Sequence, residues 1–373
     1  MGMKIALVHD WIKDISGAER VLIELHEMYP HAPIYTLFYD PKFAPQILAD
    51  AEIRSSFLQK FPFILRHYSW YAWLMPAAIE SLDLSGFDTV ISSSAIFSKG
   101  LVLRPQTRHI CYCYSPTRML WDLNSKTKFS FFKHFFRLWD KSSADRPTEF
   151  IAISQTVADR IKKYYRRDSQ IVYPPADNLV HADARQKSTG FCAMSPATRL
   201  RNVGLEQNYP LGYYLIVSRL YPHKNIDIAI QAFNKLEYPL IIIGDGPERK
   251  KLQHIAGPNI TFLGHQSDEV VASYYTACRA FIMPQEEDFG LTPIEAMSYG
   301  KPVVALARGG ATETIIEGVT GEFFDDPISE ALADALRRLN NNYPKYNPKI
   351  IKSHAAQFSS EVFKTKFKIL VEN

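Results

Sequence analysis

Residues 280–297 read AFIMPQEEDFGLTPIEAM, an apolar run that stops at a turn and passes into a helical pattern. The run ends at Met283, Gly290 lies in the turn, and the helical pattern begins near Thr292. Short β-rich runs alternate with helical patterns in this way through both halves of the chain, which is typical of parallel α/β layering. The expected fold class is therefore α/β, with strands at 4–8, 89–93, 110–114, 150–153, 213–218, 240–244, 260–263, 280–283 and 302–305.

The length of 373 residues favours two domains over a single core. Pro174 and Pro175 favour extended backbone after the first set of strands, and a stretch with little periodicity follows them. We therefore predict an N-terminal domain, a connecting segment with the hinge, a C-terminal domain and a final helix, with boundaries at 1–177, 178–208, 209–347 and 348–373. The final helix could pack on either domain.

The composition is that of an ordinary globular protein, with 46% hydrophobic and 22% charged residues. A formal net charge of +4 is too small to indicate a nucleic-acid partner. The four cysteines lack the spacing of a disulfide framework, so a reducing compartment fits best. No apolar run has the length of a membrane span, and the first residues lead directly into a strand rather than a secretory leader. We expect a cytoplasmic protein, soluble or peripheral on the inner face of the plasma membrane.

The acidic pair Glu287 and Glu295 brackets the turn of the opening segment. Its structural interpretation is a capping box, with Thr292 as N-cap, Pro293 in the first helical position and Glu295 at the third. Its functional interpretation is an anion site, because the backbone at Phe289, Gly290 and Leu291 precedes a helix N-terminus at the carboxyl end of a strand. The two carboxylates would then hold sugar or ribose hydroxyls.

A second motif, Ser218-Arg219-Leu220-Tyr221-Pro222-His223-Lys224, directly follows another strand. Arg219 and Lys224 leave that strand together and could converge on one diphosphate, Arg as a planar fork and Lys as a point charge. The alternative is that both are solvated cations of a surface loop.

Two more strand ends carry glycines. Gly244-Asp245-Gly246-Pro247 imitates the start of a dinucleotide fingerprint, but Arg249 stands at the third glycine position, so a nicotinamide oxidoreductase is disfavoured. A tight turn with Pro247 in the first helical position is the structural interpretation. Gly264 and His265 end a strand near where a nucleotide base would lie, although His265 could equally be a surface residue.

In the first half, Ser16-Gly17-Ala18-Glu19 opens a helix after the strand that ends at His9. Ser16 and Glu19 form a second predicted capping box. Gly17 and the helix N-terminus could also face the phosphates of a donor. Farther along, the chain reads HICYCYSPTR at 109–118, with Trp121 and Asp122 after it.

These motifs, in this order, resemble family 4 of the retaining glycosyltransferases, and in particular the bacterial branch that builds O-antigen, capsule and exopolysaccharide, often as mannosyltransferases. The resemblance implies the GT-B fold, with two Rossmann-like domains facing each other across a cleft. It also implies a nucleotide-sugar donor, GDP-mannose first, a glycan or lipid-linked acceptor, and no cofactor or metal. The sequence agrees on the metal, since it contains no Asp-x-Asp motif or histidine cluster.

By this resemblance Arg219 and Lys224 hold the donor diphosphate, Glu287 faces the transferred sugar, and Glu295 holds the ribose. The backbone at Phe289, Gly290 and Leu291 contacts sugar and phosphate, Gly264 and His265 lie near the base, and Gly17 covers the diphosphate from the other domain. The relatives commonly carry a histidine near the sugar where this chain has Tyr114. A tyrosine can still donate a hydrogen bond, so Tyr114 joins the expected catalytic residues. His109 should point elsewhere by strand alternation.

Two segments are both aromatic and basic, from Lys60 to Trp73 and from Lys126 to Arg137. Such mixtures suit the surface of an anionic membrane, and the alternative is a buried aromatic core with a basic rim. Two other functions stay open. One is a sugar-nucleotide epimerase of the same fold, and the other is a membrane-surface binding protein whose catalysis is impaired by Tyr114.

Overall fold

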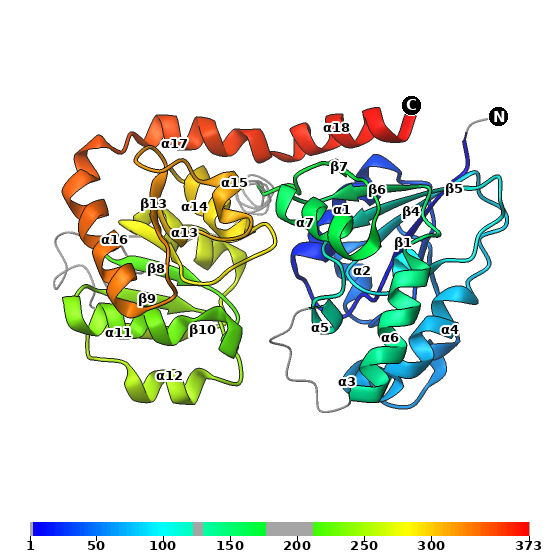
Figure 1. The fold of residues 1–373 in the computed structure, drawn as a ribbon, viewed down its shortest axis with the longest axis horizontal. Helices are drawn as coiled ribbons and strands as arrows, with labels where there is room; N and C mark the ends of the chain where they lie inside the picture. The colour runs from blue at the N-terminus through cyan, green and yellow to red at the C-terminus, as the bar shows by residue number, and fades with distance from the viewer. Residues whose placement is uncertain (1–2, 122–129, 177–211, 373) are drawn as a thin grey trace. The chain divides into compact units, whose positions relative to one another are not determined.

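A computed structural model describes residues 3–121, 130–176 and 212–372 of the chain (Figure 1). The chain divides into two compact units. Unit 1 comprises Met1–Pro174 and Glu361–Asn373, and unit 2 comprises Pro175–Ser360. The predicted connecting segment 178–208 lies outside the described residues. Within them, no helix is long and apolar enough to cross a membrane.

Unit 1 is built on a seven-stranded parallel sheet in the order β3-β2-β1-β4-β5-β6-β7. The strands are β1 Ile5–His9, β2 Ile34–Thr36, β3 Ile53–Ser55, β4 Thr89–Ser94, β5 Arg108–Cys113, β6 Glu149–Ala152 and β7 Gln170–Ile171. The central strands are buried on both faces because helices cover the sheet, which is why they read as unbroken apolar or small-residue runs (Figure 1). The helices are α1 Gly17–Met28, α2 Ala44–Ile47, α3 Ile64–His67, α4 Met75–Glu80, α5 Arg118–Trp121, α6 Ser130–Ser143 and α7 Gln155–Arg160.

Unit 2 has a six-stranded parallel sheet in the order β10-β9-β8-β11-β12-β13. Its strands are β8 Tyr214–Val217, β9 Leu240–Ile243, β10 Ile260–Gly264, β11 Ala280–Met283, β12 Val303–Leu306 and β13 Gly321–Phe324. Its helices are α11 Ile226–Leu236, α12 Arg249–Ile255, α13 Asp268–Ala277, α14 Leu291–Ser298, α15 Ala311–Thr314, α16 Ser329–Asn342 and α17 Pro348–Ala355. The strand order changes direction between β8 and β11, and their carboxyl ends meet at one edge of the sheet.

All nine strands expected from the sequence are present, with no end displaced by more than two residues. The sequence analysis missed β2, β3, β7 and β13. Three of these strands, β3, β7 and β13, form edges of a sheet, and each missed strand has four residues or fewer. Three of the missed strands, β2, β3 and β7, have only two or three residues, which are too few to show periodicity, so pairing with a neighbour defines them.

The C-terminal segment contributes to both units. α17 belongs to unit 2, whereas nearly all of α18, Ser360–Glu372, belongs to unit 1. Phe363 and Phe367 of α18 pack edge-on against Tyr112, with ring centroids 5.8 Å apart in each pair. Arg108 donates to the carbonyl oxygens of Leu370 and Val371 at 2.8 Å, satisfying acceptors that the helix end leaves unpaired. The final helical pattern, predicted as one helix, is thus two helices with different partners.

Candidate active site

The carboxyl ends of β8 and β11 bring Lys224 and Glu287 together. Lys224 ends a short 3-10 turn, η5 Pro222–Lys224, and its ammonium forms an ion pair with Oε1 of Glu287 in the loop after β11. The Lys224 side chain is 11% exposed and that of Glu287 is 24% exposed. The alternative that Lys224 is a solvated surface cation is therefore wrong. The pair lies where open α/β sheets bind their ligands.

Two adjacent glycines fix the backbone of this loop. The N–H of Gly310 donates to the carbonyl oxygen of Glu287 at 2.9 Å. A Cβ at Gly309, where φ is +64°, would lie 2.2 Å from that oxygen, and a Cβ at Gly310 would lie 2.3 Å from Cα of Phe289. The sequence analysis missed both residues. The signal was available, since paired glycines directly after a strand often mark a close backbone approach.

Helix α14 begins at Leu291, with Gly290 as its N-cap at φ +87°. As a glycine, Gly290 has no side chain with which to cap this helix. The predicted capping box of Thr292, Pro293 and Glu295 is wrong, because the helix starts before Thr292 and places Glu295 at its fifth position. Glu295 is 6% exposed and instead accepts a hydrogen bond at 3.0 Å from the hydroxyl of Tyr275. Tertiary packing places the Tyr275 hydroxyl of α13 beside this carboxylate, so Glu295 bonds to a neighbouring helix rather than to the start of its own.

Gln285 lies beside the ion pair and is 4% exposed. Its Nε2 donates to Oε1 of Glu287 at 2.9 Å, so one carboxylate oxygen receives both the ammonium of Lys224 and this amide. Oε1 of Gln285 accepts no hydrogen bond from any described residue. Phe289, which follows Glu287, is 3% exposed and packs against Phe358 with centroids 5.8 Å apart.

The remaining predicted residues of unit 2 lie along the same edge of the sheet. Arg219 is exposed, with its guanidinium 5.8 Å from the ring centroid of Tyr221. Gly264 is buried at φ +71°, and His265 is exposed. Pro247 is not in the first helical position, because α12 begins two residues later at Arg249.

The predicted capping box at the start of α1 is present. Oε2 of Glu19 accepts from the backbone N–H of Ser16 at 2.9 Å, and Gly17 lies between them as the first residue of the helix. Glu19 is 4% exposed, and its other oxygen lies 3.4 Å from Nε2 of His9. Burial acts to raise the pKa of Glu19, but the hydrogen bond and charge of His9 and the Ser16 hydroxyl hold the pKa below its ordinary value.

Tyr114 follows β5, and its hydroxyl group bonds within the protein. It donates to the carbonyl oxygen of Ala18 at 3.0 Å and lies 2.8 Å from Oγ of Ser93. Burial raises the pKa of Tyr114 well above its ordinary value, so the side chain keeps its proton. His109 points elsewhere, as expected: its Nε2 lies 2.9 Å from Oγ of Ser92, and burial lowers its pKa to about 3.

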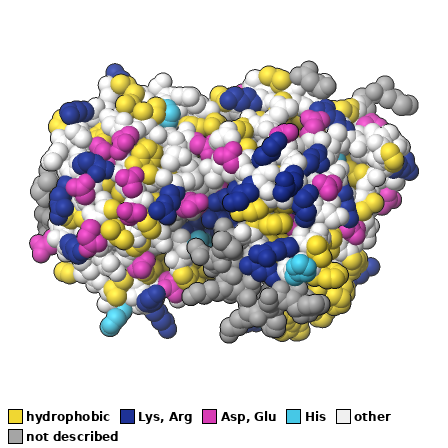
Figure 2. Space-filling view, in the orientation of Figure 1, with side chains coloured by type: hydrophobic (Ala, Val, Ile, Leu, Met, Phe, Trp, Pro, Cys, Tyr) yellow, Lys and Arg dark blue, Asp and Glu magenta, His cyan; other side chains and the backbone are white. Residues whose placement is uncertain are grey.

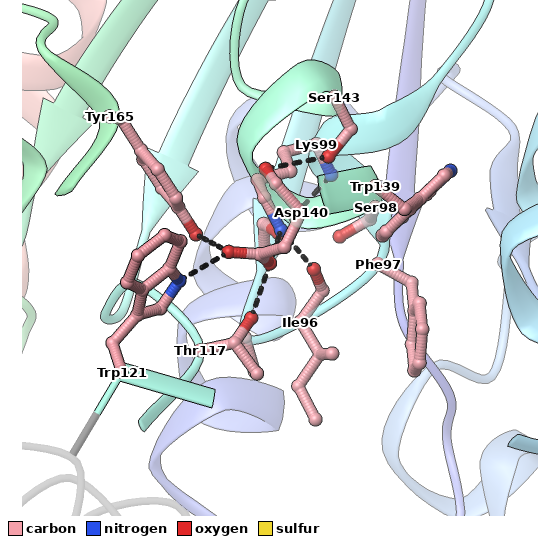
Figure 3. Close-up of polar contacts among 12 residues, drawn as sticks. Ile96, Phe97, Ser98, Lys99, Thr117, Trp121, Trp139, Asp140, Ser143 and Tyr165 are labelled. Atoms are coloured by element: carbon pink, nitrogen blue, oxygen red, sulfur yellow. Dashed lines mark hydrogen bonds and ion pairs between the residues drawn. The ribbon is translucent and has the colours of Figure 1, made fainter. Parts of the chain in front are cut away.

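The loop after Tyr114 is held by a buried carboxylate on α6. Asp140 is fully buried and forms an ion pair of 2.7 Å with Lys99 (Figure 3). Its oxygens also accept from Thr117 and Trp121 at 2.7 Å and from Tyr165 at 2.9 Å. Burial acts to raise the pKa of Asp140, but the ammonium and these donors hold the pKa below its ordinary value. A single side chain thus joins four segments of unit 1.

The first aromatic and basic segment is partly core and partly surface. Phe61, Leu65, Tyr68, Tyr71 and Leu74 pack against the core, whereas Phe63, Trp70 and Trp73 are 72%, 62% and 63% exposed. Figure 2 shows hydrophobic side chains gathered over the region of α3 and α4, with Lys and Arg side chains nearby. Of the second segment, Lys126 and Phe129 lie outside the described residues. Phe135 is 69% exposed on α6, and Phe136 packs against the core.

Two family profiles match this chain, one in each half. The profile described as "Glycosyltransferase Family 4" matches residues 15–178, and the profile described as "Glycosyl transferases group 1" matches residues 206–356. Between them these matches cover most of the chain. The chain belongs to the family 4 glycosyltransferases.

Mannosyltransferases are among its relatives. The chain is 29% identical to the O-antigen chain mannosyltransferase RfbU of Salmonella typhimurium, over 58% of this chain and 60% of that protein. It is 21% identical to the alpha-1,3/1,6-mannosyltransferase ALG2 of Dictyostelium discoideum, over 91% and 90%. With an uncharacterized glycosyltransferase of Methanocaldococcus jannaschii the identity is 32%, but the match spans only 40% of that relative's length and 37% of this chain.

Among solved structures, HepE of Anabaena in complex with UDP and glucose matches the whole chain with a TM-score of 0.71 at 19% identity. At this identity the likeness concerns the fold alone, and it shows that the two sheets are those of a GT-B protein, as predicted. Within the described residues, no group of three or more His, Cys, Asp or Glu side chains could hold a metal ion.

Proposed function

We propose that this family 4 protein is a retaining hexosyltransferase that moves a sugar, mannose first, from a nucleoside diphosphate to a glycan. The observation that carries the proposal is the Lys224 and Glu287 ion pair beside the N-terminus of α14, at the edge where β8 and β11 end. A cation, a carboxylate and helix amides within one loop system suit a diphosphate attached to a sugar. RfbU and ALG2, two mannosyltransferases among the relatives, support the choice of mannose.

In this proposal the ion pair is the resting arrangement of the donor site. When a diphosphate binds, the ammonium of Lys224 turns to its oxygens, and Arg219, which is exposed on the preceding loop, closes on it as a second cation. The N-terminus of α14 adds the positive end of its dipole. Glu287, held by Gln285, then orients the sugar hydroxyls, and Glu295 takes the ribose.

Catalysis in this scheme stabilises the charge that develops on the leaving phosphate. The departing phosphate oxygen accepts the proton of the attacking acceptor hydroxyl on the same face of the sugar, which retains the configuration without a protein nucleophile. Preorganised cations and amides are effective here because they need no rearrangement during the reaction. We propose that the reaction needs no divalent cation, so turnover should be unchanged in EDTA.

The experiment is a thermal-shift screen of the whole chain with GDP, UDP and ADP and their hexose conjugates. A donor at a hundred times its dissociation constant adds about 2.7 kcal/mol to the free energy of unfolding, enough to raise the melting temperature by several degrees. GDP-mannose should give the largest shift, and Lys224→Ala should abolish it. Lys250→Ala, an exposed lysine of the same unit, is the control. No shift with any nucleotide would refute the donor site.

Product analysis then separates the other two functions. A sugar-nucleotide epimerase isomerises its substrate, or releases free nucleotide, without an acceptor. An impaired binding protein cleaves no donor even with a lipid-linked acceptor present. A transferase yields a glycosylated acceptor whose anomeric configuration, read by NMR, matches that of the donor.

We further propose that unit 1 binds an anionic membrane, where a lipid-linked acceptor for surface polysaccharide would be found. Phe63, Trp70 and Trp73 are exposed next to the basic residues Arg66 and His67, and aromatic side chains beside cations favour the interface of such a membrane. Flotation with phosphatidylglycerol vesicles tests this. Trp70→Ser with Trp73→Ser should abolish flotation, Ile316→Ser in unit 2 should not, and a wild-type chain that fails to float would overturn the proposal.

A further inference from the structure

A chain of hydrogen bonds joins the carboxyl ends of β1, β4 and β5 to the first turn of α1. At one end the hydroxyl of Tyr114 donates to the carbonyl oxygen of Ala18 at 3.0 Å. The Tyr114 oxygen lies 2.8 Å from Oγ of Ser93, which lies 3.0 Å from Nδ1 of His9. At the other end, Nε2 of His9 lies 3.4 Å from Oε1 of Glu19. We call these five residues the anchor chain.

The chemistry of its two ends fixes the direction of every bond in the anchor chain. A carbonyl oxygen only accepts, so the one proton of the Tyr114 hydroxyl goes to Ala18. The Tyr114 oxygen must then accept from Ser93, and Ser93 must accept from Nδ1–H of His9. The carboxylate of Glu19 also only accepts, and Nε2 of His9 faces it at 3.4 Å. Each hydroxyl of the anchor chain thus has both a donor and an acceptor partner.

The order Ser93, His9 and Glu19 is also that of a nucleophile, a base and an acid, but the burial excludes a hydrolytic site. Ser93 is 1% exposed, His9 is 2% exposed and Glu19 is 4% exposed. The Ser93 hydroxyl lies between two protein partners, so no substrate carbonyl could approach it without breaking the anchor chain. The group is therefore structural within unit 1.

Both ends of the anchor chain fall on the same helical turn. Ala18 and Glu19 directly follow Gly17, and Glu19 also accepts from the backbone N–H of Ser16 before it. The backbone on either side of Gly17 is thus tied to the sheet, from one side by Tyr114 and from the other by His9. These bonds add to the packing of Val21, Leu22 and Leu25, buried apolar residues of α1 that follow the turn.

We propose that Tyr114 is a positioning residue that acts through the anchor chain to hold the Gly17 turn in place. This rests on the proposed function together with the expectation, from the family resemblance, that the Gly17 loop contacts the donor. It replaces the expectation that Tyr114 meets the sugar, because the hydroxyl proton that such a contact requires is already given to Ala18.

The test compares Tyr114→Phe with Tyr112→Phe, a matched control on the same strand. Tyr112 also donates one hydroxyl bond to a backbone carbonyl, that of Val172 at 2.9 Å, but away from α1. Peptide-level hydrogen exchange over residues 16–22 reports the turn, GDP binding reports unit 2, and release of GDP from GDP-mannose reports turnover.

Tyr114→Phe should exchange about fivefold faster in that peptide, the effect of one lost hydrogen bond. Its turnover should fall about tenfold while GDP binds within about twofold of the wild type, because a displaced contact group costs rate rather than nucleotide affinity. Tyr112→Phe should leave exchange in this peptide and turnover unchanged. Ser93→Ala breaks the anchor chain in its middle, so adding it to Tyr114→Phe should change little further.

Exchange in Tyr114→Phe equal to that of the wild type overturns the proposal whatever its turnover, and lost turnover with unchanged exchange would mean that Tyr114 touches the substrate. If the wild type neither binds GDP nor releases it from GDP-mannose, the proposed function fails. The exchange comparison still decides whether Tyr114 positions the turn.

Discussion

Two carboxylates, each paired with a lysine, serve different ends in the two units. Asp140 of unit 1 is fully buried, accepts from Lys99 and three neutral donors, and has no capacity left for a ligand (Figure 3). Glu287 of unit 2 is partly exposed at a strand end, and its partner Lys224 is a flexible cation. A satisfied pair in the core holds segments together, whereas a pair at the edge of a parallel sheet can exchange its partner for a substrate. Burial and position in the fold, rather than the presence of a salt bridge, therefore distinguish a structural carboxylate from one that could bind a substrate.

The largest expected effect is on stability. Asp140→Ala leaves the Lys99 ammonium buried without a counter-charge, which typically costs about 3 to 5 kcal/mol. Urea unfolding followed by tryptophan fluorescence should show this loss, whereas Glu287→Ala should cost less, because the Lys224 and Glu287 side chains keep partial access to water. Equal losses for the two variants would erase the distinction between the carboxylates.

The second effect is on activity, and here the Lys224 and Glu287 pair of unit 2 is the one expected to matter. Lys224→Ala and Glu287→Ala should each fold normally but lose about a hundredfold in transfer, close to 3 kcal/mol of barrier, because each removes a preorganised contact with the donor. Transfer of radiolabelled sugar to acceptor, with circular dichroism as the folding control, measures this. Wild-type turnover in either variant contradicts the assigned roles.

A smaller effect separates Glu295 from the ion pair. Tyr275→Phe removes the hydroxyl that holds Glu295 in place, and we expect GDP to bind about fivefold more weakly, the equivalent of one hydrogen bond. The control is Tyr213→Phe, which loses a hydroxyl bond of 2.8 Å to the carbonyl of Tyr274 in the same unit. Calorimetric titration of both variants decides the matter, and equal affinities would leave Glu295 without a role in the ribose site.

The smallest effect concerns pH. The pKa of Asp140 in the folded state lies below its ordinary value of 3.8, so its charged form stabilises the fold. That contribution is fully present above the unfolded pKa and is lost as the pH falls through the folded pKa. Acid titration of the free energy of unfolding should be shallower for Asp140→Asn than for the wild type below about pH 4. Parallel curves would show that the buried pair has no part in acid unfolding.

Local patterns in the sequence were sufficient for the fold class and for placing Lys224 and Glu287 at the same end of the second sheet. Apolar runs ending in turns predicted nine strands, and the parallel arrangement then placed Lys224 and Glu287 at one edge. Ser16 and Glu19 are three residues apart, so their capping box could also be read directly. The pairing of Lys224 with Glu287 could not, because 63 residues separate them in the chain.

Partners distant in sequence explain each miss. Glu295 looked like a cap because its local spacing allowed one, and Tyr275 from another helix took it instead. Tyr114 stays a predicted site residue, and its hydroxyl donates to the carbonyl oxygen of Ala18, 96 residues earlier in the chain, a partner that spacing could not reveal. Edge strands such as β13 are defined by pairing with a neighbouring strand, which the sequence alone does not show.

The sequence by itself thus determined nine of the thirteen strands that the structure describes, where their carboxyl ends carry charge, and to which family the motifs point, since these depend on periodicity and spacing along one chain. Only the tertiary structure decided which carboxylate is fully buried among four donors and which lies partly exposed at a strand end. The physical reason is that a side chain's hydrogen-bonding capacity is filled by whatever the fold brings within about 3 Å, and sequence distance carries no information about that.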